Sequence, residues 1–365
     1  MDFFQAIQLC IDKNLQFAAY RLPHNDAVRL VVQKTTSVES CEINDKLLSR
    51  KGFLLAPFTL SKTDCSLFIH ADFDYISADY TDFKELELLQ PVPLQQTDFS
   101  NGVVARKDFM LQVENIKSQI CEGRFEKVVL SRIKVIERSY RHRLTEIFQV
   151  LTASYSNAFV YLVNAGSQLW MGATPEPLMC SNKTELSTVS LAATRRYSSE
   201  NLNLHNWSTK ERVEQELVTS YIQKALNKFR ITSYSKVGPY TKKAGNLVHL
   251  RTDFTLDLHV VNGQIGNVLS ELHPTSAVCG IPKEEAMSYL LRTEKHNRRY
   301  YSGYLGPVNI EERMLLYVNL RCMQILPDRL VLYVGAGITS DSVASDEWDE
   351  TEIKADTLLS VIHKI

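Results

Sequence analysis

Apolar stretches rich in β-branched residues recur along most of this chain, and they restrict its fold more than any other feature. They occupy positions 125–136, 158–163, 247–251, 254–261, 315–320 and 330–334. Two or three long helical patterns interrupt them at irregular intervals, so hairpin connections fit better than a repeated strand–helix–strand array. The pattern predicts an α+β fold with mainly antiparallel sheet.

The length of the chain bears on its domain organisation. Its 365 residues exceed the roughly 100–200 residues of a typical domain, which predicts either two domains or one large two-lobed unit. The best candidate for a domain boundary lies near 90–108, so we divide the chain into an N-terminal lobe at 1–104 and a second region at 105–365. In the first lobe we expect an N-terminal helix at 3–20 and strands at 29–33 and 65–70. This lobe shows no chemistry of its own.

Charge and cysteine usage exclude several classes of function. The 41 Lys and Arg residues nearly balance the 42 Asp and Glu residues, and without a basic block we expect neither a nucleic-acid partner nor binding to an anionic membrane. The seven cysteines are far apart and form no Cys-x-x-Cys pair, which is typical of core thiols in a reducing compartment. No signal sequence or long apolar run is present, so a cytoplasmic location and a small-molecule ligand are expected.

The first unusual residue is a lysine in a predicted strand. An amphipathic helix is expected at 108–122, with Gly123 as its left-handed cap, and a strand should follow at 125–136. Side-chain alternation places Lys127 on the mainly apolar face of that strand. Burial would lower the pKa of its amine and suit it to accept a proton. The alternative is that the aliphatic stem covers the core while the ammonium reaches water.

A glutamate in a stiff turn offers the complementary chemistry. Glu176 lies between Pro175 and Pro177, and the two rings restrict the backbone on both sides of it. A fixed acid is what proton donation requires. A rigid surface turn with an incidental glutamate explains the same pattern.

Two acidic pairs stand at helical spacing. Ser208 and Glu211 have the spacing of a capping box that opens a helix to about residue 229, and Glu214 follows on the same face. Glu347 and Glu350 repeat the arrangement near the C-terminus, with Lys354 four residues later. Pairs that face each other could hold Mg²⁺ through carboxylate oxygens. Taken alone, each pair is better explained as a solvated helix face.

Other local patterns carry less chemistry. Gly335 and Gly337 follow an apolar strand, but they lack the third glycine and the opening helix of a dinucleotide site. They more simply let a ligand or strand approach the backbone. His249 and His273 lie in apolar surroundings and are interpreted as hydrogen-bonding core or pocket residues.

Taken together, these segments resemble the chorismate-utilising enzymes, and most closely the isochorismate synthases. The resemblance covers about 105–365 and rests on motifs that occur in the family's order, together with Glu294 and Arg298. The motifs lie at 127–132, 172–176, 190–194, 210–214, 272–282, 301–303, 319–321, 335–338 and 347–354. The resemblance implies two antiparallel sheets packed on one another and surrounded by helices, with the active site between the two halves.

The resemblance also implies catalytic roles. Lys127 matches the general base that activates water for attack on C2 of chorismate, and Glu176 matches the general acid that protonates the departing C4 hydroxyl. Mg²⁺ is the implied cofactor and would hold the C1 carboxylate. Its direct ligands would be Glu214 and Glu350, and its second acidic partners Glu211 and Glu347. The residues implied in gripping the rest of the substrate are Arg321, Tyr301, Gly335, Lys354, His249 and Thr194.

Differences within the family favour one branch. Ammonia-using relatives usually carry glutamine at the position of Lys127, so lysine favours water as the nucleophile and no glutaminase subunit is expected. Ala192 replaces the lysine that aminodeoxychorismate synthases use as a covalent nucleophile. Ala277 replaces a threonine common in ammonia-using and salicylate-forming relatives. The sequence therefore predicts an isochorismate synthase, an isomerase that feeds menaquinone or siderophore synthesis.

Two alternatives stay open at this stage. A salicylate synthase performs the same hydration and then eliminates pyruvate. A catalytically silent chorismate-binding protein is suggested by two departures from the family pattern, Ala193 in place of glycine and Gln215 in place of histidine.

Overall fold

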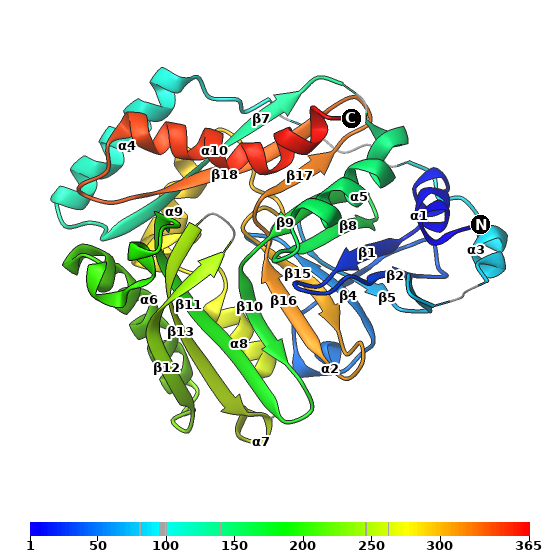
Figure 1. Ribbon diagram of the computed structural model, residues 1–365, viewed down its shortest axis with the longest axis horizontal. Helices are drawn as coiled ribbons and strands as arrows, with labels where there is room; N and C mark the ends of the chain where they lie inside the picture. Colours follow the sequence, from blue (N-terminus) through cyan, green and yellow to red (C-terminus); the bar gives the residue numbers. More distant parts are fainter. Residues whose placement is uncertain (80–81, 95–98, 100, 139, 245–246, 262) are drawn as a thin grey trace.

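The computed structural model describes residues 1–365 except 80–81, 95–98, 100, 139, 245–246 and 262. Within the described residues the strands form two nine-stranded sheets (Figure 1). Neighbouring strands within each sheet are antiparallel. The first sheet has the order β14 (Gly280–Ile281), β7 (Lys127–Ile136), β18 (Leu330–Ile338), β17 (Cys322–Ile325), β9 (Gln168–Thr174), β8 (Phe159–Ala165), β1 (Phe17–Arg21), β2 (Val28–Val32) and β6 (Phe73–Ile76).

The second sheet lies against part of the first. Its order is β12 (Ser235–Ala244), β13 (Leu247–Asp257), β11 (Glu185–Arg196), β10 (Pro177–Ser181), β16 (Met314–Val318), β15 (Tyr304–Val308), β4 (Gly52–Ala56), β5 (Ser66–His70) and β3 (Glu39–Cys41). Aromatic side chains fill the space between the sheets. The rings of Phe159 on β8 and Tyr317 on β16 stack with centroids 4.4 Å apart, and Phe53 and Leu305 belong to the same buried cluster.

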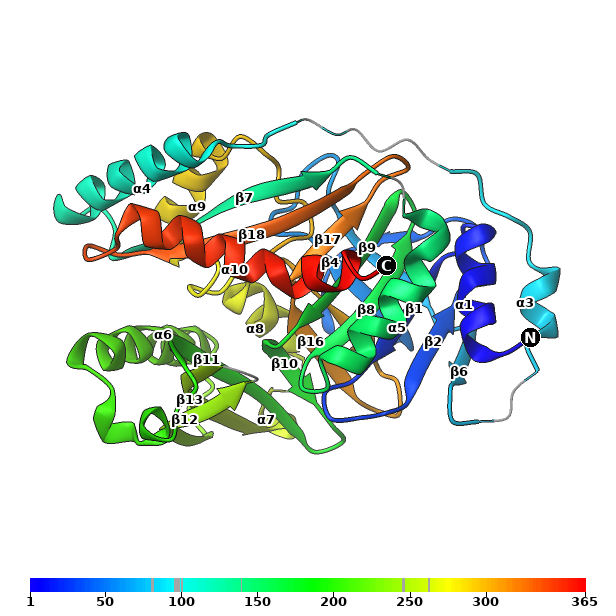
Figure 2. The ribbon, with the colours of Figure 1, turned by 45° about the horizontal axis from the view of Figure 1, so that its top comes forward.

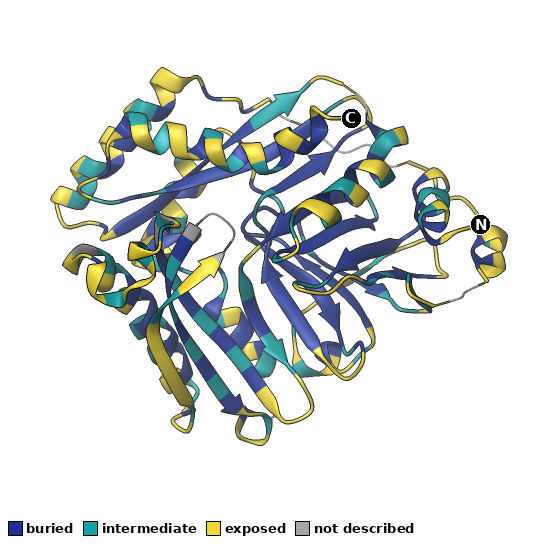
Figure 3. Cartoon of the chain, in the orientation of Figure 1, coloured by how far each residue is buried: buried dark blue, intermediate teal, exposed yellow. Residues whose placement is uncertain are grey.

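Helices cover the outer faces of both sheets (Figure 2). The first sheet packs against α1 (Phe3–Asp12), α5 (Leu144–Ser154) and α10 (Ala344–Ile362), and the second against α2 (Asp45–Leu48), α6 (Thr209–Lys228) and α8 (Ile265–Leu272). A further cluster joins α4 (Arg106–Cys121) and α9 (Lys283–Thr293) to β7 and β18. The short helices are α3 (Lys84–Leu88) and α7 (Leu258–Val261), with 3-10 turns at Arg141–Arg143, Glu200–Leu202 and Leu204–Asn206. Burial follows these layers, since the strands are mostly buried and the helices expose one side (Figure 3).

Most of the expected elements are confirmed, and two are wrong in part. The N-terminal helix ends at Asp12 instead of near residue 20. Asn14 adopts a left-handed φ of 52°, and β1 then pairs with both β2 and β8 in the interior of the first sheet. Because burial between two neighbouring strands outweighs local helix propensity, the strand wins. The stretch at 254–261 likewise divides between the end of β13 and α7.

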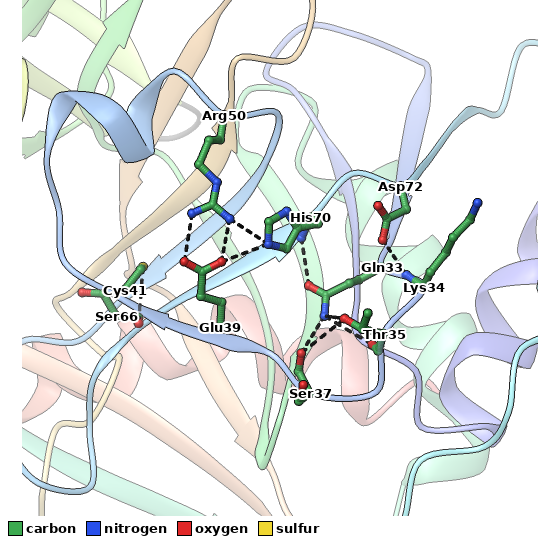
Figure 4. Close-up of polar contacts among 10 residues, drawn as sticks. All are labelled: Gln33, Lys34, Thr35, Ser37, Glu39, Cys41, Arg50, Ser66, His70 and Asp72. Carbon is green, nitrogen blue, oxygen red and sulfur yellow. Dashed lines mark hydrogen bonds and ion pairs between the residues drawn. The ribbon is translucent and has the colours of Figure 1, made fainter.

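The sheets run across the boundary drawn after residue 104. Strands from 1–104 extend the first sheet through β1 and the second through β4. The division of the chain into two domains at residue 104 stays a prediction. Polar side chains tie this part of the molecule together (Figure 4). Gln33 Oε1 accepts a hydrogen bond of 3.0 Å from the backbone N–H of His70, and Glu39 lies 3.0 Å from His70 Nε2 and 2.8 Å from Arg50 Nη1. The edge strand β3 is thereby fastened to β5.

Candidate active site

Lys127 begins β7, and its side chain reaches α6. Only 9% of the residue is exposed, and its Nζ donates a hydrogen bond of 2.8 Å to Glu214 Oε1 on α6. Gly337 on the neighbouring strand leaves room for the lysine, because a Cβ there would lie 3.0 Å from Lys127 Cε. The ammonium is therefore paired with an acid from the other half of the molecule. It is not left to reach water from an apolar face.

Glu176 lies in the turn between β9 and β10, and its backbone is fixed to β16. Its carbonyl accepts a hydrogen bond of 2.9 Å from Val318 N–H, and Thr174 Oγ1 donates to Val318 O at 2.6 Å. Burial raises the pKa of the Glu176 carboxyl to about 7, although the charges of Lys127, Lys354 and Arg321 pull this pKa down. An acid with that pKa can carry and release a proton near neutral pH.

Cationic and phenolic groups gather beside this carboxyl. Lys354 on α10 donates a hydrogen bond of 2.8 Å to Gly335 O and lies 2.5 Å from Glu350. Arg321 adopts a left-handed φ of 48° between β16 and β17. Burial lowers the pKa of its guanidinium, and the charges of Glu350 and Glu176 act on it. Such a set can bind a substrate that carries carboxylates.

Tyr301 is the phenolic group of this set. It is 4% exposed and stacks on Tyr333 at a centroid distance of 5.6 Å. Burial raises the pKa of its hydroxyl to about 12, so the hydroxyl is protonated and can donate a hydrogen bond. A Cβ on Gly335 would lie 2.9 Å from this hydroxyl, which explains why glycine occupies the position.

The four predicted metal ligands are distributed over two helices, α6 and α10. Glu211 forms the capping box of α6 with the N-cap residue Ser208, and its Oε1 accepts a hydrogen bond of 2.6 Å from Arg195 Nε. Glu214 and Glu350 each face a lysine. Glu347 is different, because burial raises the pKa of its carboxyl and its Oε2 is buried without a hydrogen-bond partner among the described residues. In the described part of the chain no three acidic, histidine or cysteine side chains converge closely enough to share an ion.

A bulge in β11 places the remaining pocket candidates. Ala193 has a φ of +56°, and the register shifts between Ala192 and Thr194, opposite His249 on β13. Burial lowers the pKa of the His249 imidazole to about 4, with smaller effects from Arg321 and Lys354, so the ring is neutral at pH 7. The side chain of Thr194 lies outside the described residues.

Gln215 has a structural explanation. It is buried, and its Nε2 donates to Ser190 Oγ at 2.9 Å and to Thr252 Oγ1 at 3.2 Å. The amide thus joins α6 to β11 and β13 directly beside Glu214.

A buried polar network lies behind the site. The sequence pointed to Glu294 and Arg298 through the family resemblance, but not to Ser131 and His296 as their partners. Ser131 on β7 donates to Glu294 Oε1 at 2.9 Å and lies 3.0 Å from His296 Nε2. Arg298 pairs with Glu294 at 2.6 Å and donates to Val278 O at 2.8 Å. Strand alternation could have found Ser131, since it shares a face with Lys127. The network holds the segment before β14 against β7.

Solved structures with this architecture define its class. An isochorismate synthase of Bacillus anthracis, described as a putative 2,3-dihydroxybenzoate-specific DhbC, superimposes with a TM-score of 0.76 at 21% identity, covering 98% of this chain and 99% of that one. MenF of Escherichia coli, a menaquinone-specific isochorismate synthase, gives a TM-score of 0.77 at 18% identity, covering 99% and 91%. The fold is therefore that of the chorismate-utilising enzymes, as the sequence predicted.

Sequence comparison identifies the family. Residues 60–363 match the model of the chorismate binding enzymes, and this chain belongs to that family. A salicylate biosynthesis isochorismate synthase of Pseudomonas aeruginosa is 29% identical over 266 residues, which span 71% of this chain and 56% of that protein. A vibriobactin-specific isochorismate synthase of Vibrio cholerae is 26% identical over 263 residues, spanning 68% and 65%. The aligned part is thus less than two thirds of the length of either relative. None of the helices in the described part could cross a membrane.

Proposed function

We propose that this protein is an isochorismate synthase, an isomerase that replaces the C4 hydroxyl of chorismate with a C2 hydroxyl from water. The observation that carries the proposal is that the charge of a buried lysine, Lys127, acts on Glu176, an acid whose pKa is raised by burial. Support also comes from the similar proteins, among which isochorismate synthases predominate. In this proposal the product feeds menaquinone or siderophore synthesis. The enzyme acts without a glutaminase subunit.

In this reaction each of the two groups moves one proton. Neutral Lys127 takes a proton from the water that attacks C2, and protonated Glu176 gives a proton to the C4 hydroxyl as the C4–O bond breaks. A base must begin neutral, so in the reacting state Glu214 has a partner other than the ammonium of Lys127. The turn that fixes Glu176 keeps its proton on one side of the ring.

The residues present suit a divalent cation as cofactor. Magnesium prefers carboxylate oxygens together with water and a substrate oxyanion, and the unpartnered Oε2 of Glu347 is a buried acceptor of that kind. Glu214 and Glu350 would hold the ion directly, with Glu211 and Glu347 as second partners. When bound, the ion would supply positive charge for the C1 carboxylate of the substrate. Arg321, Tyr301, Lys354 and the backbone of Gly335 would bind its other polar groups.

Product analysis tests the proposal. Purified protein is incubated with chorismate and Mg²⁺, and with EDTA in a parallel reaction, and the products are separated. Isochorismate that forms only with the metal is expected. Salicylate with pyruvate would identify a salicylate synthase, and a thermal shift with chorismate but no product would identify a silent binding protein.

Variants of Lys127 test the role of the base. Lys127→Ala is expected to lose at least 100-fold in kcat, the usual contribution of general base catalysis, while chorismate still binds by calorimetry. Lys127→Gln keeps a hydrogen-bond donor for Glu214 and should be equally inactive. Lys134→Ala, on the same strand but paired with Glu352, is the matched control and should keep normal turnover. Normal rates in both Lys127 variants would refute the assignment.

A further inference from the structure

A cavity adjoins Glu176 and lies beside β10 and β11 of the second sheet. It measures about 350 Å³ including its mouth, and its walls come from β10, β11, α6 and the segment before β14. Most of the lining is apolar, with Leu178, Leu191 and Val218 among the wall residues. Glu176 and Thr275 supply polar groups to the same space.

Thr275 is the unusual member of this lining. Its Oγ1 is buried and has no hydrogen-bond partner among the described residues. The other threonine of the wall, Thr188, donates its hydroxyl to Leu178 O at 2.7 Å. A buried hydroxyl without a partner costs about 1–3 kcal/mol, and an ordered water removes that cost where space allows. The cavity has room for one such water.

Proton balance in the proposed reaction creates a need for such a water. Each turnover leaves Lys127 with one proton more and Glu176 with one proton fewer than at the start. The C4 hydroxyl leaves as water, formed from the hydroxyl and the proton of Glu176. Before the next turnover Glu176 must regain a proton from solvent, and the new water must leave its side of the ring. Both events need a polar path at Glu176 that the bound ring does not block.

We propose that the cavity between Glu176 and Thr275 is a water site that receives the departing hydroxyl as water and returns a proton to Glu176. Thr275 is a positioning residue in this arrangement, because its hydroxyl holds the water that exchanges protons with the carboxyl. The inference rests on the proposed function and adds to it the group that resets the acid. It assigns a role to Thr275 that the ring-binding residues do not share.

Substitution of Thr275 tests the water site. Thr275→Val keeps the shape and removes the hydroxyl, and it is expected to lower kcat about 10-fold or more while KM for chorismate stays within twofold, since proton transfer and not binding is impaired. Its solvent deuterium isotope effect on kcat should exceed that of the wild type. Thr275→Ser restores a hydroxyl and should recover kcat to within threefold. Thr188→Val removes the other cavity hydroxyl, which already bonds backbone, and should leave the isotope effect unchanged.

The outcomes separate this inference from the proposed function. If the wild type forms no isochorismate, the proposed function fails first. If the wild type forms isochorismate and Thr275→Val matches it in kcat and isotope effect, only the water site is refuted. An equal loss of kcat in the Val and Ser variants, or a loss that follows the melting temperature, would make Thr275 a packing residue and overturn the inference.

Discussion

The pH dependence of stability offers a test of Glu176 that needs no substrate. Burial raises the pKa of this carboxyl from 4.5 to about 7 in the folded protein. Below pH 4.5 the carboxyl is protonated in both folded and unfolded chains and costs nothing. As the pH rises from about 4.5 to 7, the unfolded chain loses the proton while the folded chain keeps it, so this residue makes the protein progressively less stable.

The size of the effect follows from the shift. One pKa unit corresponds to about 1.4 kcal/mol. Because Glu176 is only partly buried, solvent reduces the total, so we expect about 1–3 kcal/mol between pH 4.5 and 7.5. Glu176→Gln should remove this loss. The difference in unfolding free energy between the variant and the wild type should therefore shift in favour of the variant by that amount from pH 4.5 to pH 7.5. Chemical denaturation at both pH values measures it.

A matched variant controls for the loss of charge. Glu216→Gln changes an exposed glutamate within α6, and its stability difference from the wild type should be within about 0.5 kcal/mol at both pH values. If Glu176→Gln shows the same flat profile as Glu216→Gln, the carboxyl of Glu176 is solvated as an ordinary surface acid. The account of its role as a proton donor would then fail.

Substitutions at Gly335 and Ala193 give further predictions. Gly335→Ala places a Cβ 2.9 Å from the Tyr301 hydroxyl and 3.0 Å from Leu130 O, so we expect a loss of about 1–3 kcal/mol in unfolding free energy and at least 10-fold weaker chorismate binding by calorimetry; unchanged binding would contradict the close contact. Ala193→Gly relieves an alanine at a φ of +56°, which costs about 1–2 kcal/mol against about 0.4–1 kcal/mol of added chain entropy. Its melting temperature should therefore rise slightly, and a fall would show that the bulge is not strained.

Local chemistry explains how far the sequence alone could lead. The strand that carries Lys127 and the helix that Ser208 and Glu211 cap were predicted because alternation and capping act over a few neighbouring residues. Both elements are present as β7 and as α6 with its capping box. The end of the first helix was misplaced because residues 17–21 form a strand through pairing with distant strands, which local propensity does not predict.

Contacts between distant residues are what the sequence could not supply. Lys127 and Glu214 are 87 positions apart, and nothing in either motif states that they meet. The same holds for the ion pair and hydrogen bonds of Glu294, which joins Ser131 across 163 positions. The resemblance to the family named the important residues, and the structure adds their partners. The shared role of the four glutamates as metal ligands stays a prediction.

The central claim is that a solvent water, activated beside Lys127, replaces the ring hydroxyl that Glu176 protonates. Incubation of the protein with chorismate and Mg²⁺ in ¹⁸O-labelled water, followed by mass spectrometry of the product, tests it most directly. The account predicts isochorismate that carries one ¹⁸O, at the C2 hydroxyl. Isochorismate whose C2 hydroxyl is unlabelled would show that the oxygen migrates within the substrate, and it would contradict the assignment of both residues.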